Sequence, residues 1–125
     1  MGADPLEVAF CHCTDCRRWT SSPAPAFAAF TAVEASETLG EGRSFAPGVR
    51  RWICPDCGSA MMAQFDYLPG QTYVPLGVID QAEALVPEVH CHADKRLSWL
   101  HIDDGKKRIS GTARAHLNAA SGEAD

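Results

Sequence analysis

The sequence predicts a mainly β protein. No window of about 11 to 18 residues shows helical periodicity with convincing caps, whereas turn-forming residues recur at short intervals. Between the turns lie short apolar runs rich in β-branched and aromatic residues, which favour extended backbone. The chain has 125 residues, of which 46% are hydrophobic, so we expect a single domain spanning residues 1–125 with its own core.

Each expected strand is bounded by a turn or by cysteines. A proline-broken loop at residues 22–25 precedes the second strand, and the turn dipeptide Pro47-Gly48 precedes the third. Gly77 would mark a bulge in the fifth strand. The expected strands are residues 6–10, 26–33, 49–53, 60–65, 72–78 and 88–93.

Helical structure is expected only in short pieces. Residues 35–39, closed by Gly40, suit one helical turn, and residues 113–120 suit a short helix near the end of the chain. In the last strand, alternation places His90 and His92 on one face and Cys91 on the other, as a buried small hydrophobe. The two histidines are expected near the surface or, alternatively, in the wall of the ligand cleft.

The composition favours a soluble cytoplasmic protein. The first residues lack a basic start followed by a long apolar run, and no segment reaches the roughly 18 apolar residues of a membrane span. Disulfides are rare in the reducing cytoplasm, so six cysteines in so short a chain point to metal or redox chemistry. The net charge of −5, with scattered basic pairs, disfavours nucleic-acid binding.

Three cysteines within six residues form the first cluster: Cys11, Cys13 and Cys16. Zinc prefers four roughly tetrahedral ligands, and this spacing supplies three of them, which is the pattern of a catalytic site with an open fourth position. His12 is flanked by ligands and is expected to point away from the ion. Asp15 is expected to shape the loop.

A zinc ion held by three thiolates is a weak Lewis acid, better suited to thiols than to water. A substrate thiol in the fourth position would be deprotonated at neutral pH and could attack an electrophile such as an aldehyde. The adjacent Arg17 and Arg18 could offset the negative site and attract an anionic substrate.

Cys54 and Cys57 form the second cluster, in the run Cys54-Pro55-Asp56-Cys57-Gly58. This run is a zinc knuckle, in which proline and glycine shape a tight turn that aims both sulfurs at one ion. The pair supplies half of a structural zinc site. A thioredoxin-type redox pair would need a βαβ context that the sequence lacks.

Taken together, the motifs resemble the glutathione-dependent formaldehyde-activating enzyme family, which includes the centromere protein V-like domains. The resemblance covers nearly the whole chain in the family's order. The matching residues are Cys11-His12-Cys13-Thr14-Asp15-Cys16-Arg17-Arg18-Trp19, Phe27-Ala28-Ala29-Phe30, Pro47-Gly48-Val49 through Cys54-Pro55-Asp56-Cys57-Gly58-Ser59, Leu76-Gly77-Val78-Ile79-Asp80, His90 and Ser98-Trp99.

The resemblance implies a tent-like arrangement of small antiparallel sheets around cysteine-ligated zinc. It assigns a catalytic zinc to Cys11, Cys13 and Cys16 and half of a structural site to Cys54 and Cys57. The implied activity is that of a carbon-sulfur lyase, S-(hydroxymethyl)glutathione synthase, with glutathione and formaldehyde as partners. Trp99 is expected in the core or in the cleft wall.

The sequence departs from the family pattern at two places. A strand bearing Cys-x-Cys-Gly usually completes the structural site, and we expect this chain to begin after it, so that Met1 need not be the native start. Substitute ligands would be Cys91, His90, His92 or a residue of a second subunit in a homodimer; otherwise the site is empty. Ser21 stands where the family commonly has glycine.

Two functions follow as alternatives. The first is a zinc-dependent lyase-like enzyme acting on the adduct of a small thiol and a small aldehyde. The second is a non-catalytic zinc-binding interaction domain. An open fourth position on the metal favours the enzyme, whereas a site closed by a fourth protein ligand favours the binding domain.

Overall fold

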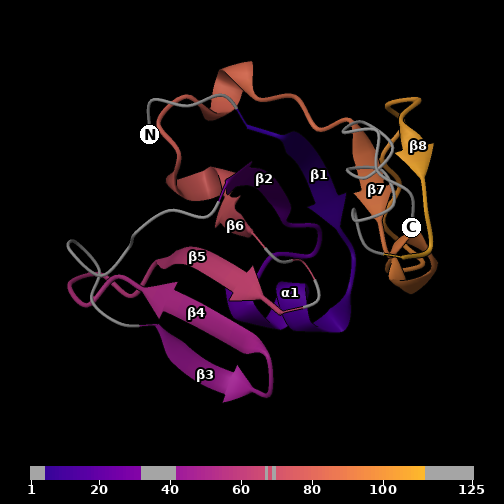
Figure 1. Ribbon diagram of the computed structural model, residues 1–125. Helices are drawn as coiled ribbons and strands as arrows, with labels where there is room; N and C mark the ends of the chain where they lie inside the picture. The colour runs from indigo at the N-terminus through magenta and orange to yellow at the C-terminus, as the bar shows by residue number, and fades with distance from the viewer. Residues whose placement is uncertain (1–4, 32–41, 67, 69, 112–125) are drawn as a thin grey trace.

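The computed structural model describes residues 5–31, 42–66, 68 and 70–111, and within this part the chain is mainly β (Figure 1). The strands are β1 (Glu7–Cys11), β2 (Ala26–Thr31), β3 (Arg43–Ala46), β4 (Val49–Ile53), β5 (Ala60–Phe65), β6 (Gln71–Pro75), β7 (Val89–Cys91) and β8 (Lys107–Arg108). One α-helix, α1 (Thr14–Thr20), and three short 3-10 helices at Leu76–Val78, Ala82–Ala84 and Ala93–Lys95 complete the described elements.

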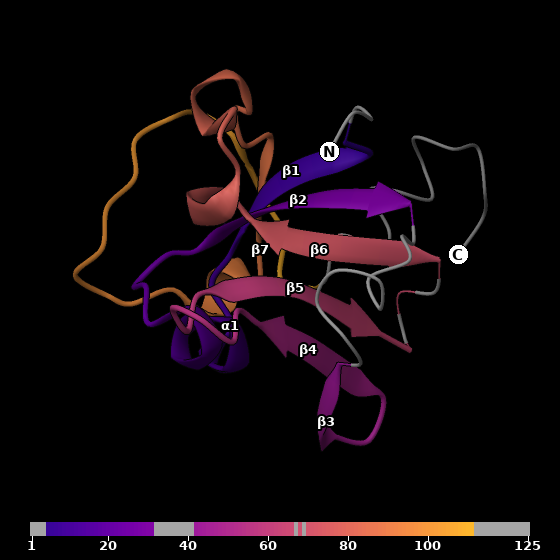
Figure 2. The ribbon, with the colours of Figure 1, turned by 90° about the vertical axis from the view of Figure 1, so that its left-hand side faces the viewer.

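The described strands form one sheet in the order β3-β4-β5-β6-β2-β1-β7-β8. Most neighbours are antiparallel, but β7 is parallel to both β1 and β8. The hairpin of β3 and β4 lies at one edge and β7 with β8 at the other (Figures 1 and 2). The mainly β class is confirmed, while the arrangement is one mixed sheet where the resemblance implied several small antiparallel ones.

The two faces of the central strands have different neighbours. Strand residues alternate between faces, so Val8 and Ala28 belong to one face and Glu7, Ala9 and Ala29 to the other. The first face carries the largest apolar cluster. Its buried members are Val8, Ala28, Phe30, Trp52, Met62 and Val74. The second face carries a smaller apolar cluster that packs against Cys11 and Cys16.

Local signals located several strands correctly. Residues 49–53 and 60–65 form β4 and β5, which pair as a hairpin around the second cysteine cluster, as predicted. The strand expected at residues 6–10 is β1, and that expected at 26–33 is β2, with residues 32 and 33 outside the described part. The helices expected at residues 35–39 and 113–120 also lie outside it.

Three expectations about elements were wrong at specific points. The strand predicted for residues 72–78 ends at Pro75, which has no N–H to donate to a ladder, and continues as a 3-10 turn rather than through a bulge at Gly77. The strand predicted for residues 88–93 ends at Cys91, because His92 adopts a left-handed conformation with φ of 50°. Helix α1 was missed, since seven residues are too few for a periodic pattern.

The prediction that Trp99 lies in the core was also wrong. Its side chain is 64% exposed. The segment around it has no regular structure apart from a turn, so no sheet face is available to bury the indole ring. None of the helices in the described ranges is long and apolar enough to cross a membrane.

Candidate metal centre

The three cysteines of the first cluster meet where β1 passes into α1. Cys11 is the last residue of β1, Cys13 is the N-cap of α1, and Cys16 lies in the helix. Their sulfur atoms all lie within 4.8 Å of one another. The chain therefore brings three thiols together through purely local structure.

Hydrogen bonds make Cys13 the acceptor of the cluster. The Cys11 thiol donates to the Cys13 sulfur at 3.5 Å, and the backbone N–H of Cys16 donates to the same sulfur at 3.3 Å. Donation by Cys11, supported by Cys16, lowers the pKa of Cys13 to about 2. The pKa of Cys11 is raised to about 12 by its bond to Cys13, and that of Cys16 is raised by its bonds to Cys11 and Cys13. Of the three thiols, Cys13 is therefore the one whose ionised form these hydrogen bonds favour.

This donor set fits zinc. With Zn–S bonds of about 2.3 Å, tetrahedral geometry separates two sulfurs by about 3.8 Å, which is compatible with the observed limit of 4.8 Å. Among the described residues, no other histidine, cysteine or carboxylate joins these three as a possible ligand. The group has the composition of a three-ligand site.

His12 points away from the cluster, as predicted for a residue between ligands. It is fully buried, and its Nε2 lies 2.8 Å from Nδ1 of His90, with the two rings stacked at 5.1 Å. His90 in turn places its Nε2 2.8 Å from the Asp104 carboxylate. Phe10 also stacks on His90, with the ring centroids 4.7 Å apart, and its ring lies 6.2 Å from that of His12. The loop carrying Cys11 and Cys13 is thereby tied to Asp104 through two rings.

The carboxylate sets the direction of this chain of hydrogen bonds. Asp104 accepts from the backbone N–H of Lys106 and from Arg108, and these bonds together with His90 hold the pKa of Asp104 well below its ordinary value. An ionised Asp104 accepts from Nε2–H of His90, so Nδ1 of His90 must accept from Nε2–H of His12. Burial, followed by the charge of His90, lowers the pKa of His12 to about 4, so the His12 ring is neutral at pH 7.

The prediction that His90 and His92 lie near the surface on one face was therefore wrong, whereas the alternative, a place in the wall of a cleft, is confirmed for His92. His90 is 1% exposed and faces His12, whereas His92, after its left-handed turn, lines a cavity together with Cys91. Cys91 is 4% exposed, as expected of a buried small hydrophobe, and burial raises its pKa to about 12.

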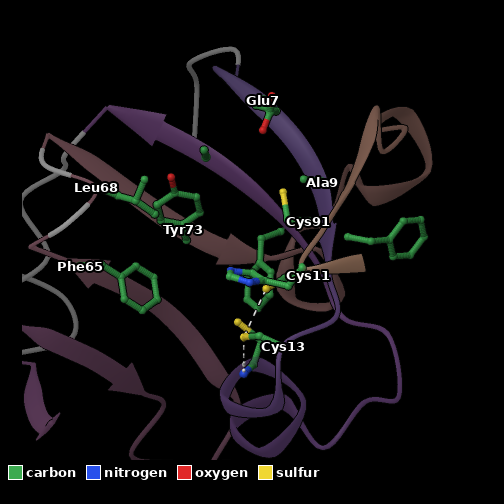
Figure 3. Close-up of a pocket in the computed structure, with 13 residues that line it drawn as sticks. Glu7, Ala9, Cys11, Cys13, Phe65, Leu68, Tyr73 and Cys91 are labelled. Atoms are coloured by element: carbon green, nitrogen blue, oxygen red, sulfur yellow. Dashed lines mark hydrogen bonds between the residues drawn. The ribbon is translucent and has the colours of Figure 1, made fainter. Parts of the chain in front are cut away.

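A cavity opens beside the cluster on the second face of the sheet (Figure 3). Its volume is about 60 Å³, and all three clustered cysteines contribute to its wall. In Figure 3, Phe65, Leu68 and Tyr73 lie across the cavity from β1, with Cys11 and Cys13 at its lower end. The thiol cluster therefore borders a half-open, mainly apolar space.

Helix α1 is held against the sheet by Trp19. The indole ring stacks on Phe27 of β2 with the ring centroids 5.9 Å apart, and the Arg51 guanidinium lies 5.3 Å above it. Arg17 bonds Thr14 within the helix, and Arg18 is exposed. Both arginines belong to α1, the helix that contains Cys16, and their effect on the charge of the cluster stays a prediction.

The second cysteine pair lies in the bend between β4 and β5, and neither of its cysteines lines the cavity beside the first cluster. The Cys57 sulfur is 3.1 Å from the Ser59 hydroxyl, which lowers the pKa of the exposed Cys57 thiol. None of the expected substitute ligands, Cys91, His90 or His92, joins this pair in the described part of the chain. That Cys54 and Cys57 bind a metal ion stays a prediction.

Sequence reasoning missed Asp104 and the residues of the cavity wall. Asp104 lies 14 positions after His90, in a loop whose Asp103-Asp104-Gly105 run signals only a turn. The cavity is assembled from α1, Leu68 and strands β1, β2, β5, β6 and β7, and it is strand pairing that brings these distant strands together. The alternation of strand residues between the two faces of the sheet was the one signal in the sequence for the residues of the cavity wall.

Comparison with known proteins agrees with the cysteine pattern. Residues 1–95 match the family model described as glutathione-dependent formaldehyde-activating enzyme. The match includes both cysteine clusters and His90. A search of curated proteins finds no match.

Proposed function

Because this chain belongs to the glutathione-dependent formaldehyde-activating enzyme family, we propose that it is a zinc-dependent enzyme of the carbon-sulfur lyase type. Its substrate would be the adduct of a small thiol and a small aldehyde, as in S-(hydroxymethyl)glutathione. The observation that carries the proposal is the three-cysteine group, which has no fourth ligand among the described residues and forms part of a cavity wall.

Cys11, Cys13 and Cys16 would hold the catalytic zinc. A zinc ion bound there would supply a Lewis-acid position that favours the thiolate form of a thiol. Arg17 and Arg18 would attract the carboxylates of a thiol such as glutathione, and the cavity would keep water from the electrophile. The His12–His90–Asp104 chain keeps the ligand loop in place.

The reaction is an addition that balances without a redox partner. The thiol sulfur forms a bond to the carbonyl carbon, the C=O π bond breaks toward oxygen, and the proton that leaves the thiol ends on that oxygen as a hydroxyl group. The reverse direction releases the thiol and the aldehyde. The cysteines of the chain are neither oxidised nor reduced in either direction.

We further propose that Cys54 and Cys57 form half of a structural zinc site, completed by ligands outside the described residues or by a second subunit in a homodimer. The cytoplasm is the proposed compartment, because all six cysteines are free and a reducing environment preserves them in that state.

The proposal is tested by exchange between ¹³C-formaldehyde and S-(hydroxymethyl)glutathione, followed by NMR on zinc-loaded protein. We expect exchange faster than the spontaneous reaction, and we expect Cys13→Ser to return it to the spontaneous rate. Thr14→Ser, a neighbouring exposed change, should keep the acceleration. Zinc content is measured on each sample.

Exchange at the spontaneous rate in protein that holds its zinc would contradict the enzyme and favour the alternative, a non-catalytic zinc-binding interaction domain. In that case the zinc should also resist displacement by glutathione, since a closed site has no position to offer.

A further inference from the structure

The cavity beside the cysteine cluster is lined mainly by hydrocarbon. Its apolar wall comes from Ala9, Phe27, Ala29, Phe65, Leu68 and Tyr73. The Tyr73 hydroxyl donates a hydrogen bond to Gln71 at 2.5 Å, so the part of Tyr73 that faces the cavity is its ring. One carboxylate, Glu7, lies at the end away from Cys13 (Figure 3) and has interactions of its own.

Two alanines create the room. Strand pairing sets Ala9 opposite Phe27 and Ala29 opposite Tyr73, so each small side chain stands beside an aromatic ring on the same face of the sheet. Ala9 and Ala29 are both buried, with 9% and 2% exposure. A larger side chain at either position would occupy the space that the cavity now leaves open.

The cavity is larger than formaldehyde requires. One water-sized group needs roughly 10–15 Å³ by this measure of volume, so about 60 Å³ holds roughly four to six such groups. Formaldehyde has only two non-hydrogen atoms. The difference corresponds to a hydrocarbon group of about two to four carbons.

The chemistry of the wall decides which reactant this group belongs to. Glutathione carries charged groups, and placing them in an apolar space would cost several kcal/mol each without partners. Its charges suit the Arg17 and Arg18 side of α1 instead. The apolar cavity therefore fits the electrophile.

We propose that this cavity takes the alkyl group of the electrophile, so that the preferred substrates are thiol adducts of aliphatic aldehydes of about three to five carbons rather than of formaldehyde. The inference rests on the proposed function and specifies its substrate class. The bond changes are those of the addition described above, and the alkyl group takes no part in them. It supplies binding only.

Binding is tested without turnover by titrating zinc-loaded protein with ethanol, 1-propanol and 1-butanol and following the methyl NMR signals of Ala9 and Ala29. We expect both signals to shift, with affinity rising about fourfold per methylene, the equivalent of ~0.8 kcal/mol. Unmoved signals, or equal affinities along the series, would overturn the proposal.

Specificity is tested by comparing kcat/KM for formaldehyde, propanal and butanal with glutathione. We expect the butanal to formaldehyde ratio to exceed one and to fall at least tenfold in Ala29→Leu, which fills the cavity. Ala84→Leu, the same change at an exposed site, should leave the ratio as it was.

The two hypotheses fail in different ways. Turnover of formaldehyde with no gain for longer aldehydes would overturn the substrate class and leave the proposed function standing. No turnover of any aldehyde would overturn the proposed function, and the substrate class with it.

Discussion

His90 is the residue that connects the ligand loop to the rest of the molecule. Its ring bonds His12 at 2.8 Å on one side and Asp104 at 2.8 Å on the other, and it is almost completely buried. His12 itself lies between two of the three clustered cysteines. The position of Cys11 and Cys13 therefore depends on a residue 78 positions away from His12.

We predict that His90→Gln weakens zinc binding by about tenfold, because residues that orient ligands typically contribute 10- to 100-fold to metal affinity. The affinity is measured by competition with a chromophoric chelator. His101→Gln replaces an exposed histidine and serves as the control. Equal affinities in the two variants would show that the loop holds its shape without His90.

Asp104 gives the same chain a pH dependence. Because its pKa is lower in the folded protein than in the unfolded chain, Asp104 stabilises the fold above the unfolded pKa of about 4, and this stabilisation is lost as the pH falls through the folded pKa. Asp104→Asn should therefore destabilise the protein at pH 7 more than at pH 3. Denaturant unfolding at both pH values measures this, and an equal difference at the two would refute it.

The residues that could be predicted from the sequence are those linked by local structure. Cys11, Cys13 and Cys16 lie within six positions, so any compact turn brings their sulfurs together. Asp104 and His90 meet because β8, which follows Asp104, pairs with β7, and His90 meets His12 because β7 pairs with β1. No spacing rule relates these two residues, and no pattern in the chain predicts that they join His12.

Among the elements, the short helix α1 contributes most directly to the cysteine cluster. It starts at the Cys13 N-cap and contains Cys16, and with seven residues it is too short to be stable alone. Packing of Trp19 on Phe27 supplies the tertiary contact that such a helix needs. The geometry of the cluster thus depends on the indole ring of Trp19, although Trp19 is not one of the proposed metal ligands.

We predict that Trp19→Ala destabilises the protein by about 2–3 kcal/mol, somewhat less than for a fully buried tryptophan because Trp19 is half-buried. The zinc-free variant should also react faster with a thiol reagent at Cys16. Trp99→Ala, at a position 64% exposed, should change stability by no more than about 0.5 kcal/mol. Similar losses in both variants would contradict the anchoring role of Trp19.

Elements were predictable where one strand follows the next through a tight turn. The β4–β5 hairpin was found because two apolar runs flank the Cys54-to-Gly58 bend. The end of β7 was missed because the left-handed conformation of His92 leaves no mark in the pattern of apolar residues. The two-residue β8 is held by pairing with β7 alone and has no pattern of its own.

At the scale of the whole molecule, the main apolar core and the cysteine cluster lie on opposite faces of the sheet. One face carries the cluster that includes Val8, Phe30 and Trp52, and the other carries the cavity and the thiols. A metal ion that binds only the folded chain adds stability in proportion to the logarithm of its concentration over its dissociation constant. The fold and the site are therefore linked through the residues at the junction of β1 and α1.

The central claim is that three cysteines hold a metal ion with a position free for a thiol. It is tested most directly by the absorption spectrum of the cobalt(II)-substituted protein, titrated with glutathione and, as a control, with S-methylglutathione. We predict a tetrahedral thiolate spectrum that changes and saturates with glutathione but not with the methylated form. A spectrum that neither compound alters would mean a closed site and would contradict the account.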